Sequence, residues 1–150
     1  MIEGSSGLSI SRLAADDRPE WQRLFVAYND FYEQRYEEST YDRAWDLFQQ
    51  DSVMHVLGAT IDGRLVGLTH FLVHASTTAP DVCYLEDLYT IPEARGQGVG
   101  RALIGAVTDW ARDRECSRVY WLTRDSNSTA RRLYDHVASN SGFIVYEIPL

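Results

Sequence analysis

Lysine is missing from this chain, and all 14 of its basic side chains are arginines. A nucleotide-binding P-loop needs a lysine directly after its glycines, so that motif is excluded. The two cysteines, Cys83 and Cys116, are too few for a disulfide framework. No apolar run reaches membrane-spanning length, and the N-terminus lacks the apolar core of a signal peptide. We therefore expect a soluble protein of a reducing compartment, the cytoplasm, with no membrane partner.

The charge that is present is unevenly distributed along the chain, whose net charge is −8. Residues 1–94 hold 6 arginines and 16 acidic side chains, whereas residues 95–150 hold 8 arginines and 6 acidic side chains. The first portion repels nucleic acid and attracts cations, and the second portion is suited to an anion. Acidic side chains that simply keep the protein soluble explain the total charge equally well.

Hydrophobic periodicity predicts a single α/β domain over residues 8–150, after a flexible tail at residues 1–7. Alternating apolar residues predict strands at 8–12, 53–61, 64–73, 82–91, 118–123 and 143–148, with Asp62-Gly63 as a hairpin turn. Apolar residues three and four apart predict two helices before the second strand, one after the fourth and one after the fifth. The order β-α-α-β-β-β-α-β-α-β requires a mixed sheet, because βαβ crossovers near the C-terminus make parallel neighbours.

The predicted strand at 82–91 is apolar on both faces and carries two adjacent acidic residues, Glu86 and Asp87. Because side chains alternate along a strand, these two are predicted to point to opposite faces. An ionised carboxylate is costly to bury, so each is expected to have a partner, access to water or a chemical role.

A glycine-rich loop follows this strand and opens the next helix. Gly96, Gly98 and Gly100 predict backbone N–H groups that are free to bind an anion at the positive end of the helix dipole. Glycine early in a helix weakens it by up to about 1 kcal/mol, which is tolerated where the backbone approaches a ligand closely. The glycine spacing differs from the dinucleotide-binding fingerprint and disfavours that type of site.

Aromatic and acidic residues gather between the first two predicted helices. Glu33 and Tyr36 are candidates there for binding a substrate ammonium group by ion pairing and cation–π contact. For most residues of this region, packing of the aromatic rings in the core and solvation of the acids is the simpler interpretation. His70 and His74 have the spacing of helical metal ligands but lie in a predicted strand, so no metal site is expected.

Several short motifs in the second half of the chain recur together in one known family. Arg95-Gly96-Gln97-Gly98-Val99-Gly100 fits the pattern Q/R-x-x-G-x-G/A. Asn127-x-x-Ala130-x-x-Leu133-Tyr134 lies upstream of Gly142-Phe143, and Tyr84-Leu85-Glu86-Asp87 precedes the glycine loop. These motifs resemble those of the GCN5-related N-acetyltransferases, the GNAT superfamily, and are similar to its small-amine branch of spermidine/spermine acetyltransferases and HPA2-like proteins. The match covers about residues 82–146, and the first 80 residues match in element order alone.

The resemblance implies a GNAT fold, with a mostly antiparallel sheet, a splayed parallel pair and flanking helices. It also implies acetyl-CoA as co-substrate, Tyr134 as the acid that protonates the departing thiolate of coenzyme A, and, by analogy, a homodimer. The cofactor-binding residues that it implies are Leu88, Tyr89, Thr90, Arg95, Gly96, Gln97, Gly98, Val99, Gly100, Arg101 and Asn127.

Acetyl transfer to an amine needs a base for the substrate ammonium and an acid for the leaving group. Glu86 is the candidate base, directly or through a water, and Asp87 is the second choice; an acid at Glu86 can instead bind the substrate cation. A phenol has a pKa of about 10 and a thiol of about 8.5, so Tyr134 is a competent acid, although its apolar helix face is also that of a core tyrosine.

We therefore expect an N-acetyltransferase that moves an acetyl group to the primary amine of a small cationic substrate, such as a polyamine, by direct transfer in a ternary complex. Asp87, Glu33 and Tyr36 are the candidate substrate-binding residues. Two alternatives stay open: acetylation of protein lysines or N-termini, and a non-catalytic sensor that binds acyl-CoA.

Overall fold

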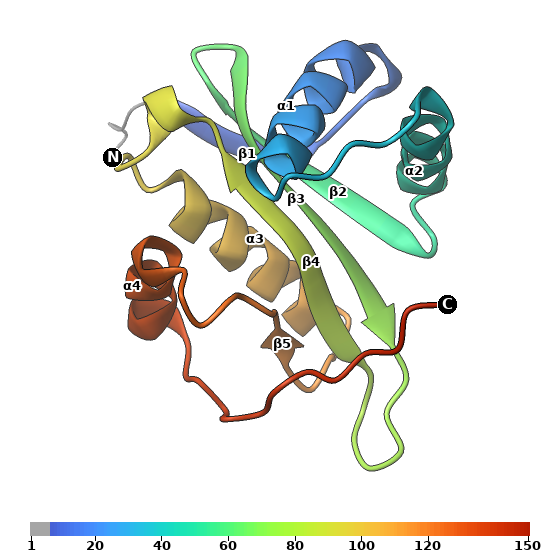
Figure 1. Ribbon diagram of the computed structural model, residues 1–150, viewed down its shortest axis with the longest axis vertical. Coiled ribbons are helices and arrows are strands. Elements are labelled where there is room, and N and C mark those ends of the chain that lie inside the picture. Colours follow the sequence, from blue (N-terminus) through green and yellow to red (C-terminus); the bar gives the residue numbers. More distant parts are fainter. Residues whose placement is uncertain (1–6) are drawn as a thin grey trace.

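The computed structural model describes residues 7–150 and consists of a mixed sheet with helices on both faces (Figure 1). The predicted tail at residues 1–7 therefore lies outside the described residues except for Gly7. In chain order the elements are β1 Leu8–Arg12, a short 3-10 turn at Ala15–Asp17, α1 Arg18–Phe31, α2 Glu38–Gln50, β2 Met54–Ile61, β3 Arg64–His74, β4 Val82–Thr90, a second 3-10 turn at Pro92–Ala94, α3 Val99–Asp113, β5 Val119–Tyr120 and α4 Ser128–Val137.

The sheet has the strand order β1-β2-β3-β4-β5, in which the first four strands are antiparallel and β4 pairs with β5 in parallel. This confirms the predicted mixed sheet with one parallel pair. The turn between β2 and β3 is Asp62-Gly63, and both residues have positive φ, as the favoured two-residue hairpins require. Among residues 7–150, no helix combines the length and the apolarity needed to cross a bilayer.

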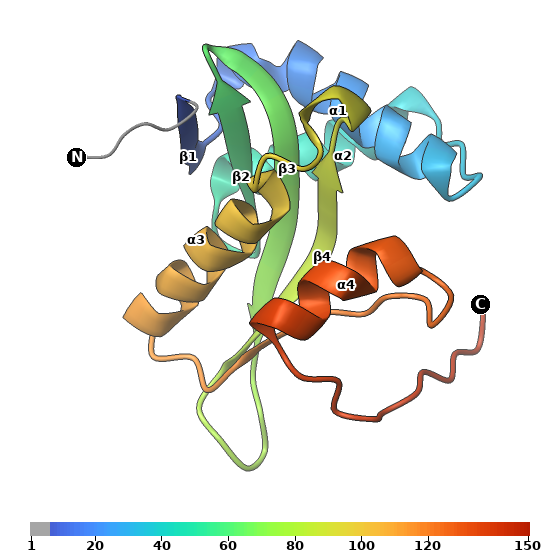
Figure 2. The same ribbon diagram turned by 90° about the vertical axis from the view of Figure 1, so that its left-hand side faces the viewer.

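Helices cover both faces of the sheet, with α1 and α2 on one side and α3 on the other (Figure 2). The aromatic residues of α1 and α2 pack around the fully buried Trp21, whose ring lies 4.9 Å from Trp45 and 5.8 Å from Phe48. Core packing is therefore the correct interpretation of most aromatic residues in the first 50 positions. On the opposite face, α4 packs beside α3 through Leu133 and Val137.

Gly67 of β3 brings the start of α3 close to the sheet. A Cβ at this position would lie 2.8 Å from Val99 Cγ1 and 3.0 Å from the carbonyl oxygen of Tyr89. Only glycine leaves room for so close an approach. The contact fixes the beginning of α3 next to the end of β4, where the glycine-rich loop lies.

The C-terminal part of the chain differs from the prediction. The strand predicted at 118–123 is reduced to Val119–Tyr120, and the strand predicted at 143–148 does not form. The apolar side chains of residues 142–150 instead face solvent, with Phe143 90% and Tyr146 89% exposed. A strand needs a partner edge for its backbone, and the two residues of β5 offer too short a ladder to hold a neighbour.

Candidate active site

The glycine-rich loop leaves a row of backbone N–H groups without partners at the start of α3. Gly98 caps the helix with φ +81°, and Gly96 also has a positive φ of +80°. The first amide of this region with a backbone acceptor is that of Ala102, which donates to the carbonyl oxygen of Gly98 at 3.0 Å. Within residues 7–150, the amides of residues 96–101 have no acceptor, and they lie at the positive end of a 15-residue helix.

The surroundings of this loop suit an anion. A Cβ at Gly96 or Gly98 would meet no atom within 4 Å, so the space beside their backbone is open. Side-chain bonds from Arg95 Nε to the carbonyl oxygen of Thr90 (3.2 Å) and from Gln97 Nε2 to that of Glu93 (3.4 Å) hold the loop in shape. Gly100 also lets α4 pack closely, because a Cβ at this position would lie 3.2 Å from Leu133 Cδ2.

The parallel strands β4 and β5 separate next to this loop. They pair only at Cys83 with Val119 and at Tyr84 with Tyr120. Further along β4, Leu88, Tyr89 and Thr90 pair with β3 on one side and have no β5 partner on the other. The edge of β4 that faces β5 is therefore open where the sequence predicts contact with an extended ligand.

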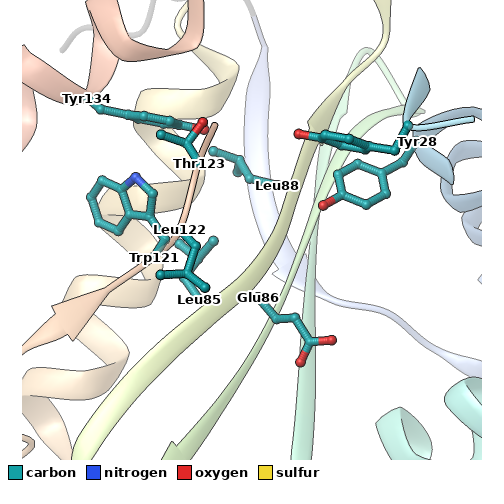
Figure 3. A pocket seen from close by; sticks show the side chains of 9 residues that line it. Tyr28, Leu85, Glu86, Leu88, Trp121, Leu122, Thr123 and Tyr134 are labelled. Atoms are coloured by element: carbon teal, nitrogen blue, oxygen red, sulfur yellow. The ribbon is translucent and has the colours of Figure 1, made fainter. Parts of the chain in front are cut away.

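A pocket lies in this gap between the strands. Figure 3 shows Tyr28 of α1 on one side, Tyr134 of α4 on the other, and Glu86 on β4 between them. The remaining lining residues are Tyr32, Leu85, Leu88, Trp121, Leu122 and Thr123. The predicted acid and the predicted base thus line one pocket, which opens beside the free edge of β4.

Tyr134 is half-buried and its ring packs edge-on against Trp121, with the centroids 5.4 Å apart. Burial, with a smaller contribution from the charge of ionised Tyr32, raises the pKa of Tyr134 above that of a free phenol. The hydroxyl therefore keeps its proton across the neutral range, as a proton donor must.

Glu86 occupies an irregular position in β4. His70 of β3 pairs with Asp87 and the next residue, Phe71, pairs with Leu85, so Glu86 is the extra residue of a β-bulge. Glu86 keeps access to solvent, yet the surrounding protein desolvates it enough to raise its pKa. The charge of Asp87 raises this pKa further, whereas His70 lowers it.

The bulge makes the strict alternation predicted for Glu86 and Asp87 wrong. Asp87 does not line the pocket: its Oδ2 lies 2.8 Å from Nδ1 of His70, whose ring packs against Phe25 and Phe48 of α1 and α2. Figure 3 shows the Glu86 side chain on the same side of β4 as Tyr28 of α1, so both carboxylates lie toward the side that α1 covers. An inserted residue shifts the alternation by one position, and sequence alone does not show the insertion.

Three other predicted site residues, Asn127, Glu33 and Tyr36, do not line the pocket. Asn127 caps α4, with its Oδ1 accepting from the Ala130 amide at 3.4 Å. Glu33 and Tyr36 follow the end of α1, are exposed and do not line the pocket. Glu33 borders a separate hollow with Asp30, Gln34 and Arg35. Within the described part of the chain, no three His, Cys, Asp or Glu side chains are grouped as metal ligands.

Sequence reasoning missed Tyr28 and Trp121 as pocket residues. Tyr28 belongs to the apolar stripe of α1, which also buries Trp21 and Leu24. That pattern predicts a helix face but does not separate a tyrosine inside the core from one at its rim. Trp121 gave no signal of its own, because it lies just beyond β5, where the separation of β4 and β5 opens the pocket.

Comparison with known proteins places this geometry in one family. The model of the acetyltransferase (GNAT) family matches residues 21–138. The D-amino-acid N-acetyltransferase HPA3 of Saccharomyces cerevisiae is 29% identical over 143 residues, covering 92% of this chain and 88% of that protein. The thialysine N-epsilon-acetyltransferase of Mus musculus is 35% identical over 99 residues, 59% of this chain and 57% of that one. The fold is similar to that of aminoglycoside N-acetyltransferase AAC(6')-Iy solved in complex with CoA, with a TM-score of 0.86, 16% identity and 99% of both chains covered.

Proposed function

Because this chain belongs to the GNAT family of acetyltransferases, we propose that it moves an acetyl group from acetyl-CoA to the primary amine of a small cationic substrate. The observation that carries the proposal is that Tyr134 and Glu86 line one pocket, next to the open edge of β4 and the free amides of residues 96–101. We further propose direct transfer in a ternary complex, by residues 8–150 acting as one domain.

The residues present fit coenzyme A. The free amides and the open space beside Gly96 and Gly98 fit a pyrophosphate, which binds well at a helix N-terminus. The unpaired edge of β4 at Leu88, Tyr89 and Thr90 fits the amide groups of an extended arm, which can add to the sheet like a strand. Arg95 and Arg101 add positive charge at the loop.

Acetyl-CoA supplies the activated acetyl thioester when it is bound. Two residues of the chain then handle the protons of the reaction: one accepts a proton and the other holds one ready to donate. Glu86 takes a proton at its carboxylate, directly or through a water, so that the substrate amine becomes neutral; its raised pKa makes it a better base than an ordinary glutamate. Tyr134 holds a proton at its hydroxyl for the sulfur that leaves.

The class of substrate rests on charge and on the relatives. The pocket presents one carboxylate and the π faces of tyrosines, which together favour an ammonium group. The separate hollow lined by Asp30, Glu33 and Arg35 carries a net charge of −1 and would attract a second cationic group of a polyamine-like substrate. Relatives named for thialysine, D-amino acids and aminoglycosides all act on amines.

We also propose a homodimer, in which residues 142–150 of one copy cover the sheet edge of the other. Ile144 is 74% and Ile148 84% exposed, an apolar surface that a second copy would bury. The β5 edge has no neighbour among the described residues, so its backbone groups are available to that segment. Light scattering is expected to show a dimer for the intact chain and a monomer after deletion of residues 142–150; a monomeric intact chain would contradict the proposal.

The free thiols Cys83 and Cys116 support a reducing compartment, and we propose the cytoplasm.

Thiol release from acetyl-CoA tests the activity. Polyamines, aminoglycosides, free amino acids and lysine-bearing peptides are offered in parallel. We expect release with small diamines or polyamines. Release with peptides alone would support protein acetylation, and coenzyme binding without release for any amine would support an acyl-CoA sensor.

A further inference from the structure

Arg124 lies beside the pocket, between its two walls. It directly follows Thr123, which lines the pocket on the side of Tyr134, whereas Tyr28 of α1 lies on the opposite side (Figure 3). The guanidinium carbon Cζ of Arg124 lies 5.4 Å from the centroid of the Tyr32 ring. Tyr32 caps the end of α1 and lines the pocket from there. The Arg124 side chain therefore connects the wall that leads to α4 with the wall formed by α1.

The backbone around Arg124 is held in place by contacts with the start of α4. The carbonyl oxygen of Arg124 accepts from the Asn127 amide at 2.9 Å, which closes a turn. Nη1 of Arg131 donates to both the carbonyl oxygen and Oδ1 of Asp125, each at 2.9 Å. These bonds fix the point at which the Arg124 side chain leaves the backbone, and the Tyr32 ring supports its guanidinium group by cation–π contact.

The positive charge of Arg124 is left without an acidic partner. Asp125, its neighbour in the chain, is already paired with Arg131. Among residues 7–150, neither Arg124 nor Glu86 takes part in an ion pair with another side chain. Contact with an aromatic ring occupies a face of a guanidinium group and leaves the N–H donors at its edge, which match the two oxygens of a carboxylate. The pocket thus offers a carboxylate of its own at Glu86 and a guanidinium group at its rim.

We propose that Arg124 is a specificity-determining residue that binds the carboxylate of a diamino-acid substrate, while Glu86 binds the distal ammonium group that is to be acetylated. The inference rests on the proposed function and names the class of small cationic amine that matches both charges. A diamino acid such as ornithine carries two ammonium groups and one carboxylate, so it is still cationic at neutral pH. A diamine or polyamine also pairs with Glu86, but it meets repulsion from Arg124 in place of an ion pair.

Ornithine and 1,4-diaminobutane test the proposal, because they differ only by a carboxylate group. Binding of each is measured by NMR titration of the intact protein without acetyl-CoA. We expect ornithine to bind about tenfold more tightly, the lower end of the range for a hydrogen bond to a charged group, because Arg124 is exposed and water screens its charge. Ornithinamide, in which a neutral amide replaces the carboxylate, should bind like diaminobutane. Diaminobutane that bound as tightly as ornithine would overturn the proposal.

Arg124→Gln should remove the preference for ornithine without weakening the binding of diaminobutane. Arg124→Lys keeps the charge but loses the planar pair of donors, so it should retain part of the preference. Arg43→Gln is the matched control: it removes the same charge from an exposed position of α2, outside the pocket, and should retain the full preference. If Arg124→Gln weakened both ligands equally, or if Arg43→Gln had the same effect as Arg124→Gln, the proposed contact would be refuted. Backbone amide spectra of each variant check that the fold is retained.

The Nε–H signal of Arg124 gives a readout that a purely structural contact with Tyr32 would not move. In ¹H–¹⁵N NMR spectra of the arginine side chains, this signal is the one that disappears in Arg124→Gln. Ornithine should shift it, whereas diaminobutane should not, and a signal that stays in place at saturating ornithine would contradict binding by Arg124. Because neither titration requires turnover, both tests keep their meaning if the thiol-release assay for acetyl transfer fails.

Discussion

Replacing Gly67 with alanine tests whether the contact between β3 and α3 sets both the stability of the protein and the geometry of the coenzyme site. The new methyl group would lie 2.8 Å from Val99 Cγ1, 3.0 Å from the Tyr89 carbonyl oxygen and 3.2 Å from Leu103 Cδ1. The carbonyl oxygen belongs to the sheet backbone, and the valine side chain has little rotamer freedom. The start of α3 must therefore move away from β4.

The magnitude follows from these contacts. Overpacking a tight core site costs about 1–3 kcal/mol. For a domain of this size, each 1 kcal/mol lowers the melting temperature by about 2–4 °C, so we expect a decrease of about 2–12 °C. Because Val99 is the first residue of α3, the same movement shifts the free amides of the loop relative to the open edge of β4. Acetyl-CoA should bind more weakly, whereas the chemical step should be less affected.

Urea denaturation and calorimetric titration of acetyl-CoA measure the two effects, and Gly105→Ala is the matched control. Gly105 is an exposed position inside α3 where a Cβ meets no atom within 4 Å. Alanine there should stabilise the helix by about 0.5–1 kcal/mol and leave coenzyme binding unchanged. If Gly67→Ala were as stable as the original chain and bound acetyl-CoA normally, the idea that this close contact positions the loop would be refuted.

Three further changes test the roles proposed for individual residues. Tyr134→Phe should lower turnover about 100-fold or more, the usual contribution of a general acid, with acetyl-CoA affinity unchanged in calorimetry; an unaltered rate would exclude the acid role. In Glu86→Gln, the limb of the pH–rate profile that falls toward low pH should disappear, because protonation of Glu86 at its raised pKa removes the base. The raised pKa also means that ionised Glu86 destabilises the fold, so Glu86→Gln should be more stable than the original chain at neutral pH. This difference in stability should vanish as the pH falls through the pKa of Glu86 and the carboxylate of the original chain is protonated. Equal urea midpoints of the two proteins at all pH values would argue against this effect. Gly98→Val should abolish coenzyme binding while the circular dichroism spectrum is retained. Gly63→Ala is the control for backbone strain, because Gly63 has a similar φ of +82° but lies at a distant hairpin, and this variant should still bind the coenzyme.

The parts of the site that sequence predicts are those fixed by local backbone chemistry. Gly96 and Gly98 have positive φ, a conformation that favours glycine, so a motif of glycines reports the loop directly. Asn127 caps the start of α4, and Tyr134, seven residues later, lines the pocket. Seven residues are about two helical turns, so helical spacing alone predicts that both lie on the same side of the helix. The hairpin at Asp62-Gly63 is predicted for the same local reason.

The parts that sequence misses depend on partners far away in the chain. The bulge at Glu86 exists only in relation to the register of β3, which no pattern within β4 reveals. Trp21 and His70 are 49 residues apart, and each looks like an ordinary core residue until the fold brings them together. The segment at 142–150 has the apolar pattern of a strand, but whether a strand forms depends on the edge that it meets.

The bulge explains how two neighbouring carboxylates can serve one reaction without sharing one role. In a regular strand, one of the two would face α3, in the apolar layer formed by Phe71, Cys83 and Leu85, where an ionised group has no partner. The extra residue keeps both on the other side and separates their surroundings: Glu86 reaches the pocket and solvent, whereas Asp87 is held by His70. Desolvation first, and then repulsion from the charge of Asp87, raise the pKa of Glu86, which is the group that the proposed mechanism needs as a base. Removing the charge of Asp87 should therefore lower the pKa of Glu86, so the pH–rate profile of Asp87→Asn should shift toward lower pH. A shift in the opposite direction would mean that Asp87 does not act on Glu86 through its charge.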